Sequence, residues 1–150
     1  MKIEKSVSWG LYPKFKFYVR EFDSSNYKSN FIKNSIVYGN GRSYGDSCVN
    51  KNLIDLKSFN HFLNFDQTNG VLTLQSGTLL KDIIEICIPK GWFLITNPGT
   101  KLITVGGAIA SDIHGKNHHK EGCFSECVNW FNLLLPNGEV KKCSINQNKE

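Results

Sequence analysis

The chain has 150 residues, of which 40% are hydrophobic and 12% aromatic, and it carries a formal net charge of +5. This length and apolar content are enough for one globular unit with a buried core, which excludes intrinsic disorder, and the apolar runs are too short for a transmembrane segment. The lysines and arginines are scattered among asparagines and serines, so they predict no nucleic-acid partner, although their excess would attract a phosphate-bearing ligand.

The first predicted elements are a strand and the glycine-rich loop that follows it. Residues 1–34 are aromatic and basic, with a turn signal at Trp9-Gly10, and we treat them as an N-terminal lead-in. Residues 35–38 predict a short buried strand, which runs directly into the loop GNGRSYGD at residues 39–46. Residues 52–56 predict the next strand.

A hairpin and an amphipathic helix are predicted next. Residues 61–65 and 71–74 are apolar runs on either side of a turn, where Asn69-Gly70 supplies the positive-φ residues that a tight turn needs. Residues 79–87 place apolar side chains on one face of a helix, with Thr78 as its N-cap and a proline after its end.

The C-terminal part is predicted to hold a strand, a short helix and a second hairpin. The strand is residues 92–95, the helix of small residues is 104–110, and the hairpin is 128–143. The sequence has no internal repeat and no low-complexity linker, so we predict no boundary within residues 35–150. The polar tail at residues 144–150 directly follows a strand, and we expect the chain to be cut there.

The glycine-rich loop is the first candidate binding site. Gly39, Gly41 and Gly45 would let backbone N–H groups point into one concavity, and Arg42 and Ser43 add donors suited to a diphosphate. The alternative is an ordinary glycine-rich turn. The loop is not a Walker loop, because no Gly-Lys-Ser/Thr follows, and it is a poor Rossmann fingerprint, because a hairpin comes next.

A second candidate site combines glycines with hydroxyl side chains. Gly106 and Gly107 would let the backbone approach a flat ligand closely. Thr104, Ser111 and His114 offer hydrogen bonds along the edge of such a ligand. The alternative is close packing of small residues between a helix and a sheet.

A cluster of histidines and cysteines suggests a zinc site as a third candidate. His114, His118 and His119 are followed by Cys123 and Cys127, but no second compact pair completes a tetrahedral set, so we predict no metal. The five cysteines are an odd number without a small secreted framework, which favours free thiols. With no signal-peptide pattern at the N-terminus, we expect a cytoplasmic protein.

Residues 39–46 and 97–119, together with Trp9-Gly10, resemble the vanillyl-alcohol-oxidase-type flavoproteins, whose FAD domain is called PCMH-type. Among these, the likeness is strongest to the branch that oxidises decaprenylphosphoryl-ribose. The resemblance implies an α+β fold of two α/β subdomains with FAD between them. It assigns residues 35–150 to an incomplete FAD-binding domain, because members of the family continue into a substrate domain that this sequence lacks.

The resemblance carries the family's FAD contacts onto individual positions of this chain. The residues expected to bind the pyrophosphate are Val37, Tyr38, Gly39, Asn40, Gly41, Arg42, Ser43, Tyr44, Gly45, Asp46 and Ser47. Those expected on the flavin side are Gly99, Thr104, Val105, Gly106 and Gly107, followed by Ser111, Asp112, Ile113 and His114 beside the isoalloxazine ring. Relatives that oxidise aldonolactones or alditols bond a histidine covalently to the flavin, but Arg42 stands at that position here, which implies noncovalent FAD.

The resemblance implies a flavin-dependent oxidoreductase that oxidises a sugar or sugar-alcohol carbinol, with a polyprenyl-phosphoryl pentose as one candidate substrate. It assigns no catalytic residue in this chain. The alternative is a truncated FAD-binding module without activity of its own, and a separate chain could supply the missing half. A metal-dependent hydrolase built on the histidine cluster is a third hypothesis.

Overall fold

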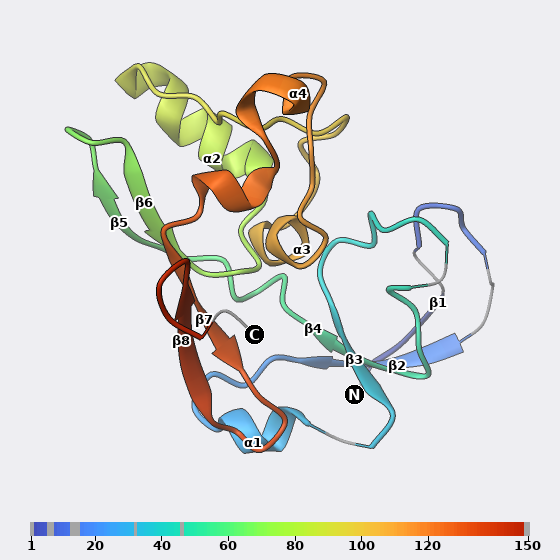
Figure 1. Cartoon of the computed structure of the whole chain (residues 1–150). Helices are drawn as coiled ribbons and strands as arrows, with labels where there is room; N and C mark the ends of the chain where they lie inside the picture. The colour runs from blue at the N-terminus through green and yellow to red at the C-terminus, as the bar shows by residue number, and fades with distance from the viewer. Residues whose placement is uncertain (1, 6–7, 13–15, 32, 46, 149–150) are drawn as a thin grey trace.

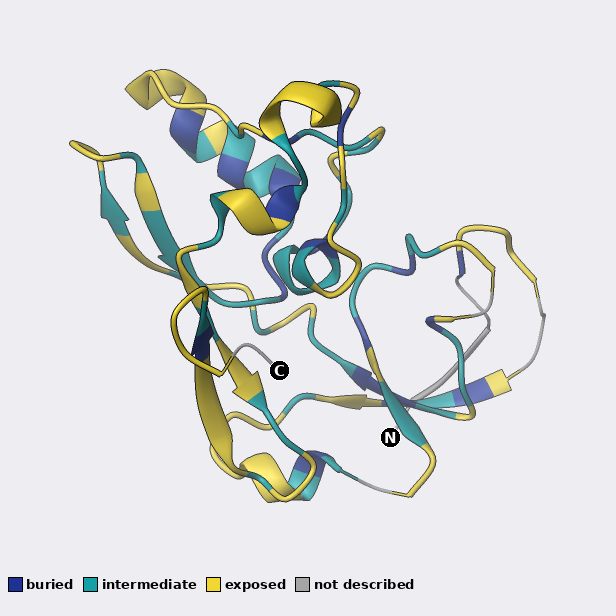
Figure 2. Ribbon diagram, in the orientation of Figure 1, coloured by how far each residue is buried: buried dark blue, intermediate teal, exposed yellow. Residues whose placement is uncertain are grey.

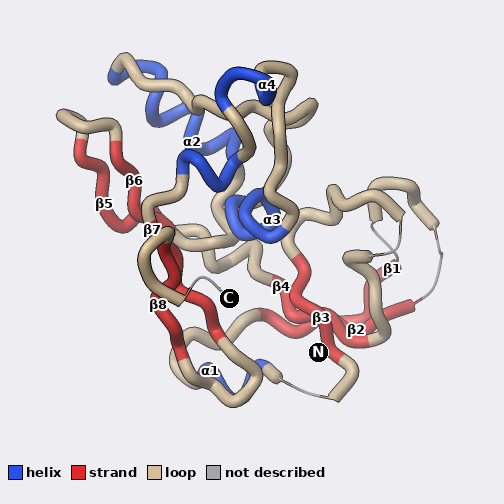
Figure 3. Tube along the Cα trace, in the orientation of Figure 1, coloured by secondary structure: helices blue, strands red, loops and turns tan. Residues whose placement is uncertain are grey.

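The computed structural model describes residues 2–5, 8–12, 16–31, 33–45 and 47–148. Figure 1 shows two neighbouring parts, one built on the sheet that contains the N-terminal strands and one in which the longer helices gather. Figure 3, which is coloured by secondary structure, shows strands β1 to β4 on one side and helices α2, α3 and α4 on the other. Each part has its own cluster of buried apolar side chains, in agreement with the two subdomains expected.

The first part is a four-stranded sheet with the order β1-β2-β4-β3. Its strands are β1 (Lys2–Lys5), β2 (Lys16–Glu21), β3 (Ser35–Tyr38) and β4 (Asn52–Asp55), and the short helix α1 (Tyr27–Asn30) joins β2 to β3. Strands β2 and β3 both pair with β4 in parallel, whereas β1 pairs with β2 in antiparallel. The predicted strands 35–38 and 52–56 are confirmed, the second one residue shorter, and the predicted lead-in supplies two strands of the same sheet.

Alternation of side chains along these strands builds the first core. Phe17 and Val19 of β2 are buried and pack with Leu53 of β4. Since successive side chains of a strand point to opposite faces, Tyr38 at the end of β3 is buried whereas its neighbour Val37 is 48% exposed. The face of β3 that carries Val37 is therefore open toward the loop that follows.

The second part is made of a hairpin, three helices and two short 3-10 segments. They are β5 (Phe62–Asp66), β6 (Val71–Leu74), α2 (Leu80–Cys87), η1 (Ile88–Lys90), α3 (Val105–Ala110), α4 (His118–Glu121) and η2 (Phe124–Cys127). Leu80, Ile83 and Cys87 lie on one face of α2 and pack with Ala108 and Phe124. Ala108 is completely buried, so the small residues of α3 serve close packing here. Burial also raises the pKa of the Cys87 thiol.

Thr78 is not the N-cap of α2, contrary to the prediction. Leu79 holds that position, and the Asp82 carboxylate accepts a hydrogen bond from the Leu79 N–H at 3.4 Å. The Thr78 hydroxyl is buried and makes no hydrogen bond with any residue that the structure describes. The Thr78 carbonyl oxygen instead accepts from the Val105 N–H at 2.8 Å, so this residue joins the start of α2 to the start of α3.

Residues 92–95 do not form the predicted strand. The Trp92 indole N–H donates to the Gln67 carbonyl oxygen at 2.9 Å, and the Trp92 backbone N–H donates to the Cys87 carbonyl oxygen at 3.1 Å. These bonds fasten the segment to the β5–β6 turn and to the end of α2. Its backbone is therefore held by a side chain and a helix terminus instead of by a neighbouring strand.

The last element is the antiparallel hairpin of β7 (Trp130–Leu134) and β8 (Val140–Ser144), which confirms the hairpin predicted at residues 128–143. Its turn contains Gly138 at a φ of 83°, as expected of an Asn-Gly pair. Figure 2 shows that most of this hairpin is exposed, in contrast to α2 and α3. In the described part of the chain, no helix combines the length and apolar character needed to cross a membrane.

Candidate functional site

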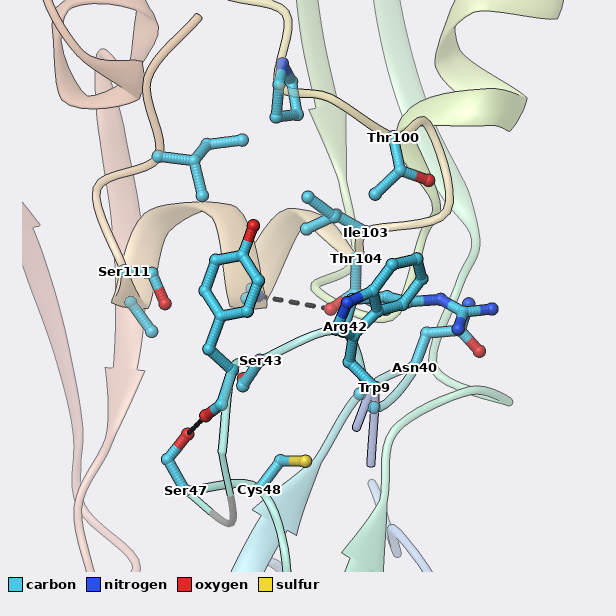
Figure 4. Close-up of a pocket in the computed structure, with 18 of the residues that line it drawn as sticks. Trp9, Asn40, Arg42, Ser43, Ser47, Cys48, Thr100, Ile103, Thr104 and Ser111 are labelled. Atoms are coloured by element: carbon cyan, nitrogen blue, oxygen red, sulfur yellow. Dashed lines mark hydrogen bonds between the residues drawn. The ribbon is translucent and has the colours of Figure 1, made fainter. Parts of the chain in front are cut away.

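A cavity of about 880 Å³ lies where the loop after β3 meets the start of α3. Figure 4 shows the polar side chains that surround it, with Trp9, Asn40, Arg42 and Ser43 near one another and Ser111 across from them. Its lining comes from the N-terminal segment, from residues 37–56 and from residues 98–114. Cavities of this size accommodate cofactors and other small molecules.

Most of the predicted binding residues line this cavity, although they come from two separate segments. They are Val37, Gly39, Asn40, Gly41, Arg42, Ser43, Tyr44, Ser47, Gly99, Thr104, Gly106, Gly107, Ser111, Ile113 and His114. The structure thus brings the glycine-rich loop and the glycine–hydroxyl segment to one place. Residue patterns alone do not reveal that these two segments are close in space.

Four predicted residues lie outside the lining, each for a physical reason. Tyr38 points into the core of the sheet, and Val105 packs against the second core. The Asp112 carboxylate accepts a hydrogen bond from the Ser125 N–H at 2.9 Å. A Cβ atom on Gly45 would meet only open space. A fifth predicted residue, Asp46, is outside the described residues.

The lining also includes residues that the sequence did not single out as binding residues. They are Trp9, Cys48, Leu56, Pro98, Thr100, Ile103 and Ala110. Pro98, Thr100, Ile103 and Ala110 lie within the segment that carried the resemblance, and Trp9 was part of it without a role. Cys48 directly follows the predicted loop residue Ser47, and Leu56 directly follows strand β4.

Close contacts tie the glycine-rich loop to the start of α3. The Asn40 side-chain amide donates to the Leu102 carbonyl oxygen at 2.8 Å. A Cβ atom on Gly39 would lie 2.6 Å from the Thr104 hydroxyl oxygen, so only glycine fits this approach. Gly41 has a φ of 61°, a left-handed conformation that glycine adopts without strain.

The start of α3 offers no free backbone donor at its first three positions. The Val105 and Gly106 N–H groups donate to the carbonyl oxygens of Thr78 and Ser76, both at 2.8 Å. The Gly107 N–H donates to the hydroxyl oxygen of Thr104, the N-cap, at 3.2 Å. The protein itself therefore satisfies these amides, and donors for a ligand must come from elsewhere.

The glycine-rich loop supplies those donors. The backbone N–H groups of Gly41, Arg42 and Ser43 donate no hydrogen bond to any residue that the structure describes. The Nε atom of Arg42 is buried and has no hydrogen-bond partner among the same residues. Buried donors without acceptors are costly, and charged ones especially so. A diphosphate in the cavity would supply acceptors for donors of this kind, so the residues present fit FAD.

The histidines and cysteines considered as a candidate zinc site are not gathered around one point. The rings of His114 and His118 are 5.3 Å apart between centroids, and His118 Nδ1 lies 3.0 Å from the Gly115 carbonyl oxygen. Among the described residues, no three His, Cys, Asp or Glu side chains are grouped so that they could hold a metal ion. His114 belongs instead to the lining of the cavity.

Comparison with protein families and curated proteins places the chain among flavoproteins. A family model described as an FAD binding domain matches residues 32–144. Decaprenylphosphoryl-beta-D-ribose oxidase of Mycolicibacterium smegmatis is 40% identical over 108 residues, which are 71% of this chain and 24% of that protein. D-lactate dehydrogenase of Anaerostipes hadrus is 34% identical over 97 residues, which are 65% of this chain and 20% of that protein.

A solved structure shares the fold. Xylooligosaccharide oxidase from Myceliophthora thermophila C1, solved in complex with xylobiose, superposes with a TM-score of 0.64 at 19% sequence identity. The superposition covers 77% of this chain and 25% of that one. The chain thus spans between 20% and 25% of the length of these three proteins.

Proposed function

The chain belongs to the FAD binding domain family, as the sequence predicted, and from that premise we propose that it holds FAD noncovalently as part of an oxidoreductase acting on a sugar or sugar-alcohol carbinol. The observation that carries the proposal is the set of unpaired donors in the loop, above all the buried Arg42 Nε. The α+β FAD-binding fold and the relation to flavin oxidoreductases that act on CH–OH groups are shown by the matches themselves.

Each part of the lining suits a different part of FAD. The N–H groups of Gly41, Arg42 and Ser43 would bind the diphosphate together with the Arg42 side chain. Gly106 and Gly107 line the opposite side of the cavity, where the flavin ring would lie, and a Cβ atom on either would press on Ser76 or Thr104 within the protein. When bound, FAD supplies an acceptor for the hydride of a substrate carbon, while the protein supplies orientation and electrostatics.

Arg42 supports noncovalent binding. A covalent tether to a flavin needs a nucleophilic side chain that can lose a proton, as imidazole or thiolate can. A guanidinium group stays protonated in proteins, so Arg42 can donate charge-assisted hydrogen bonds but cannot attack carbon. Of the other lining residues, His114 and Cys48 have the chemistry for attachment.

The substrate class rests on the relatives. Two are named for the oxidation of a phosphoryl-ribose and for the dehydrogenation of lactate, and both of these compounds carry a CH–OH group. A polyprenyl-phosphoryl sugar is the finer proposal. Because the chain spans only a fraction of these proteins, a second candidate is an FAD-binding module without activity of its own, whose partner is a separate chain.

FAD titration of the dialysed protein tests the proposed function. We expect saturable binding of one FAD per chain, seen as a change in flavin fluorescence and absorption, and weaker binding of FMN, which lacks the second phosphate. Acid precipitation of the loaded protein should then leave all flavin in the supernatant. Absence of FAD binding would overturn the proposal, and flavin retained in the pellet would identify His114 or Cys48 as a covalent anchor.

A further inference from the structure

Trp9 lies outside the residues that the family model matches, yet it lines the cavity. The centroid of its ring is 5.5 Å from Cζ of Arg42, and Figure 4 shows the two side chains side by side. Trp9 is 53% exposed, so deep burial in a core does not explain its position. An aromatic face at this distance attracts a guanidinium group through the quadrupole of the ring.

A short turn presents the indole to the cavity. Ser8 is buried, its hydroxyl donates to the Tyr12 carbonyl oxygen at 3.0 Å, and its carbonyl oxygen accepts from the Leu11 N–H at 3.1 Å. These two bonds close residues 8–12 on themselves. The turn therefore fixes the direction in which Trp9 leaves the backbone.

Arg42 needs a restraint that leaves its donors free. Among the residues that the structure describes, no carboxylate forms an ion pair with it, and its buried Nε has no acceptor. A carboxylate beside the guanidinium would use up N–H groups. An indole face holds the flat guanidinium without using any of them, so all remain available to an anionic ligand.

We propose that Trp9 is a positioning residue of the FAD site, which stacks on Arg42 and holds its guanidinium ready for the diphosphate. The inference rests on the proposed function, because it takes FAD as the anionic ligand. It makes the N-terminal segment part of the cofactor site, although that segment precedes the matched residues. Trp9 acts through Arg42, so removing Arg42 should make Trp9 unimportant for FAD affinity.

A double-mutant cycle on FAD affinity tests this inference. Trp9→Leu should raise the Kd for FAD about fivefold, as expected for a cation–π contact at a half-exposed site, whereas Trp9→Phe should stay within about twofold of wild type. In an Arg42→Gln background, Trp9→Leu should have no further effect. Trp130→Leu is the matched control, since Trp130 makes the same kind of contact with Lys142, at 4.7 Å, on the outer hairpin.

A second measurement weakens the quadrupole of the Trp9 ring while leaving the shape of the side chain nearly unchanged. In a Trp92→Phe, Trp130→Phe background, Trp9 is the only tryptophan. Fluorinated tryptophan at that position has a weaker ring quadrupole, so FAD affinity should fall with each added fluorine. A purely structural role would not respond.

Three outcomes would overturn the inference while leaving the proposed function intact. They are wild-type affinity in Trp9→Leu, an undiminished effect of Trp9→Leu in the Arg42→Gln background, and no response to fluorination. Failure of the wild-type protein itself to bind FAD would instead overturn the proposed function, and the inference with it.

Discussion

Gly41 combines two properties at the residue scale, a φ of 61° and a place in the lining of the cavity. A valine there would be strained by about 1–3 kcal/mol and would also project a branched side chain next to the diphosphate. We therefore expect Gly41→Val to raise the Kd for FAD by about tenfold or more in a fluorescence titration.

Gly45 separates these two effects. Its φ of 65° is nearly the same, but it lies outside the lining and faces open space. Gly45→Val should therefore lower the stability of the fold by a similar amount, measured by urea unfolding, while changing the Kd for FAD by less than Gly41→Val. Equal losses of affinity in the two variants would show that strain alone, and not contact with the cofactor, explains the effect.

Sequence reasoning at this scale was accurate for residues whose role depends on their own backbone. Glycine at position 41 is favoured locally, by its positive φ, and this position lines the cavity. It was less informative where the role depends on a partner distant in sequence. The contact of Trp9 with Arg42 is set by tertiary packing, which no local pattern encodes.

At the scale of elements, α3 depends on the cap that Thr104 provides. The Thr104 hydroxyl oxygen accepts from the Gly107 N–H, and the residue is 4% exposed. Thr104→Val keeps the shape but removes the acceptor, so we expect a loss of about 1 kcal/mol in the free energy of unfolding. Thr68→Val, at an exposed position in the β5–β6 turn, is the matched control and should leave urea unfolding unchanged. A Thr104→Val variant as stable as wild type would contradict the importance of the cap.

Elements with a strong local signal were predicted correctly. Both hairpins contain an Asn-Gly turn, and the apolar face of α2 repeats at helical spacing, so each is specified within a few residues. The strand predicted at residues 92–95 failed because the bond from Trp92 to Gln67 overrides β propensity. Strand β2 was not predicted because its parallel partner, β4, lies more than thirty residues further along the chain.

For the molecule as a whole, we expect FAD binding without substrate turnover. A protein that binds a hydride acceptor but does not position the substrate loses an orientation effect that is worth roughly 7–11 kcal/mol of the barrier. The relatives are four to five times longer than the part that matches. Anaerobic mixing of the FAD-loaded chain with sugars, sugar alcohols or lactate should therefore leave the flavin absorption bands unbleached. Rapid bleaching by any of these compounds would show that residues 1–150 contain a working active site.

The whole fold was predictable only through the resemblance. Patterns of residues gave separate strands, helices and a loop, but not the fact that residues of the segments 39–44 and 98–114 line one cavity. Their approach depends on contacts such as the one between Asn40 and the Leu102 carbonyl oxygen, which are far apart in the chain. Two long sequence motifs in a fixed order supplied that information, and the family match confirmed it.

The central place of β4 in the first sheet has a consequence for how the protein is made. Strands β2 and β3 do not pair with each other. Strand β3 pairs with β4, and β2 pairs with β4 on one edge and with β1 on the other, so both depend on a strand that is synthesised after them. Until residues 52–55 leave the ribosome, β2 and β3 each keep an unpaired edge, and such edges are prone to association with other chains. The glycine-rich loop connects β3 to β4, so its two ends come together when these strands pair. We therefore expect the sheet and the cofactor loop to form together during synthesis.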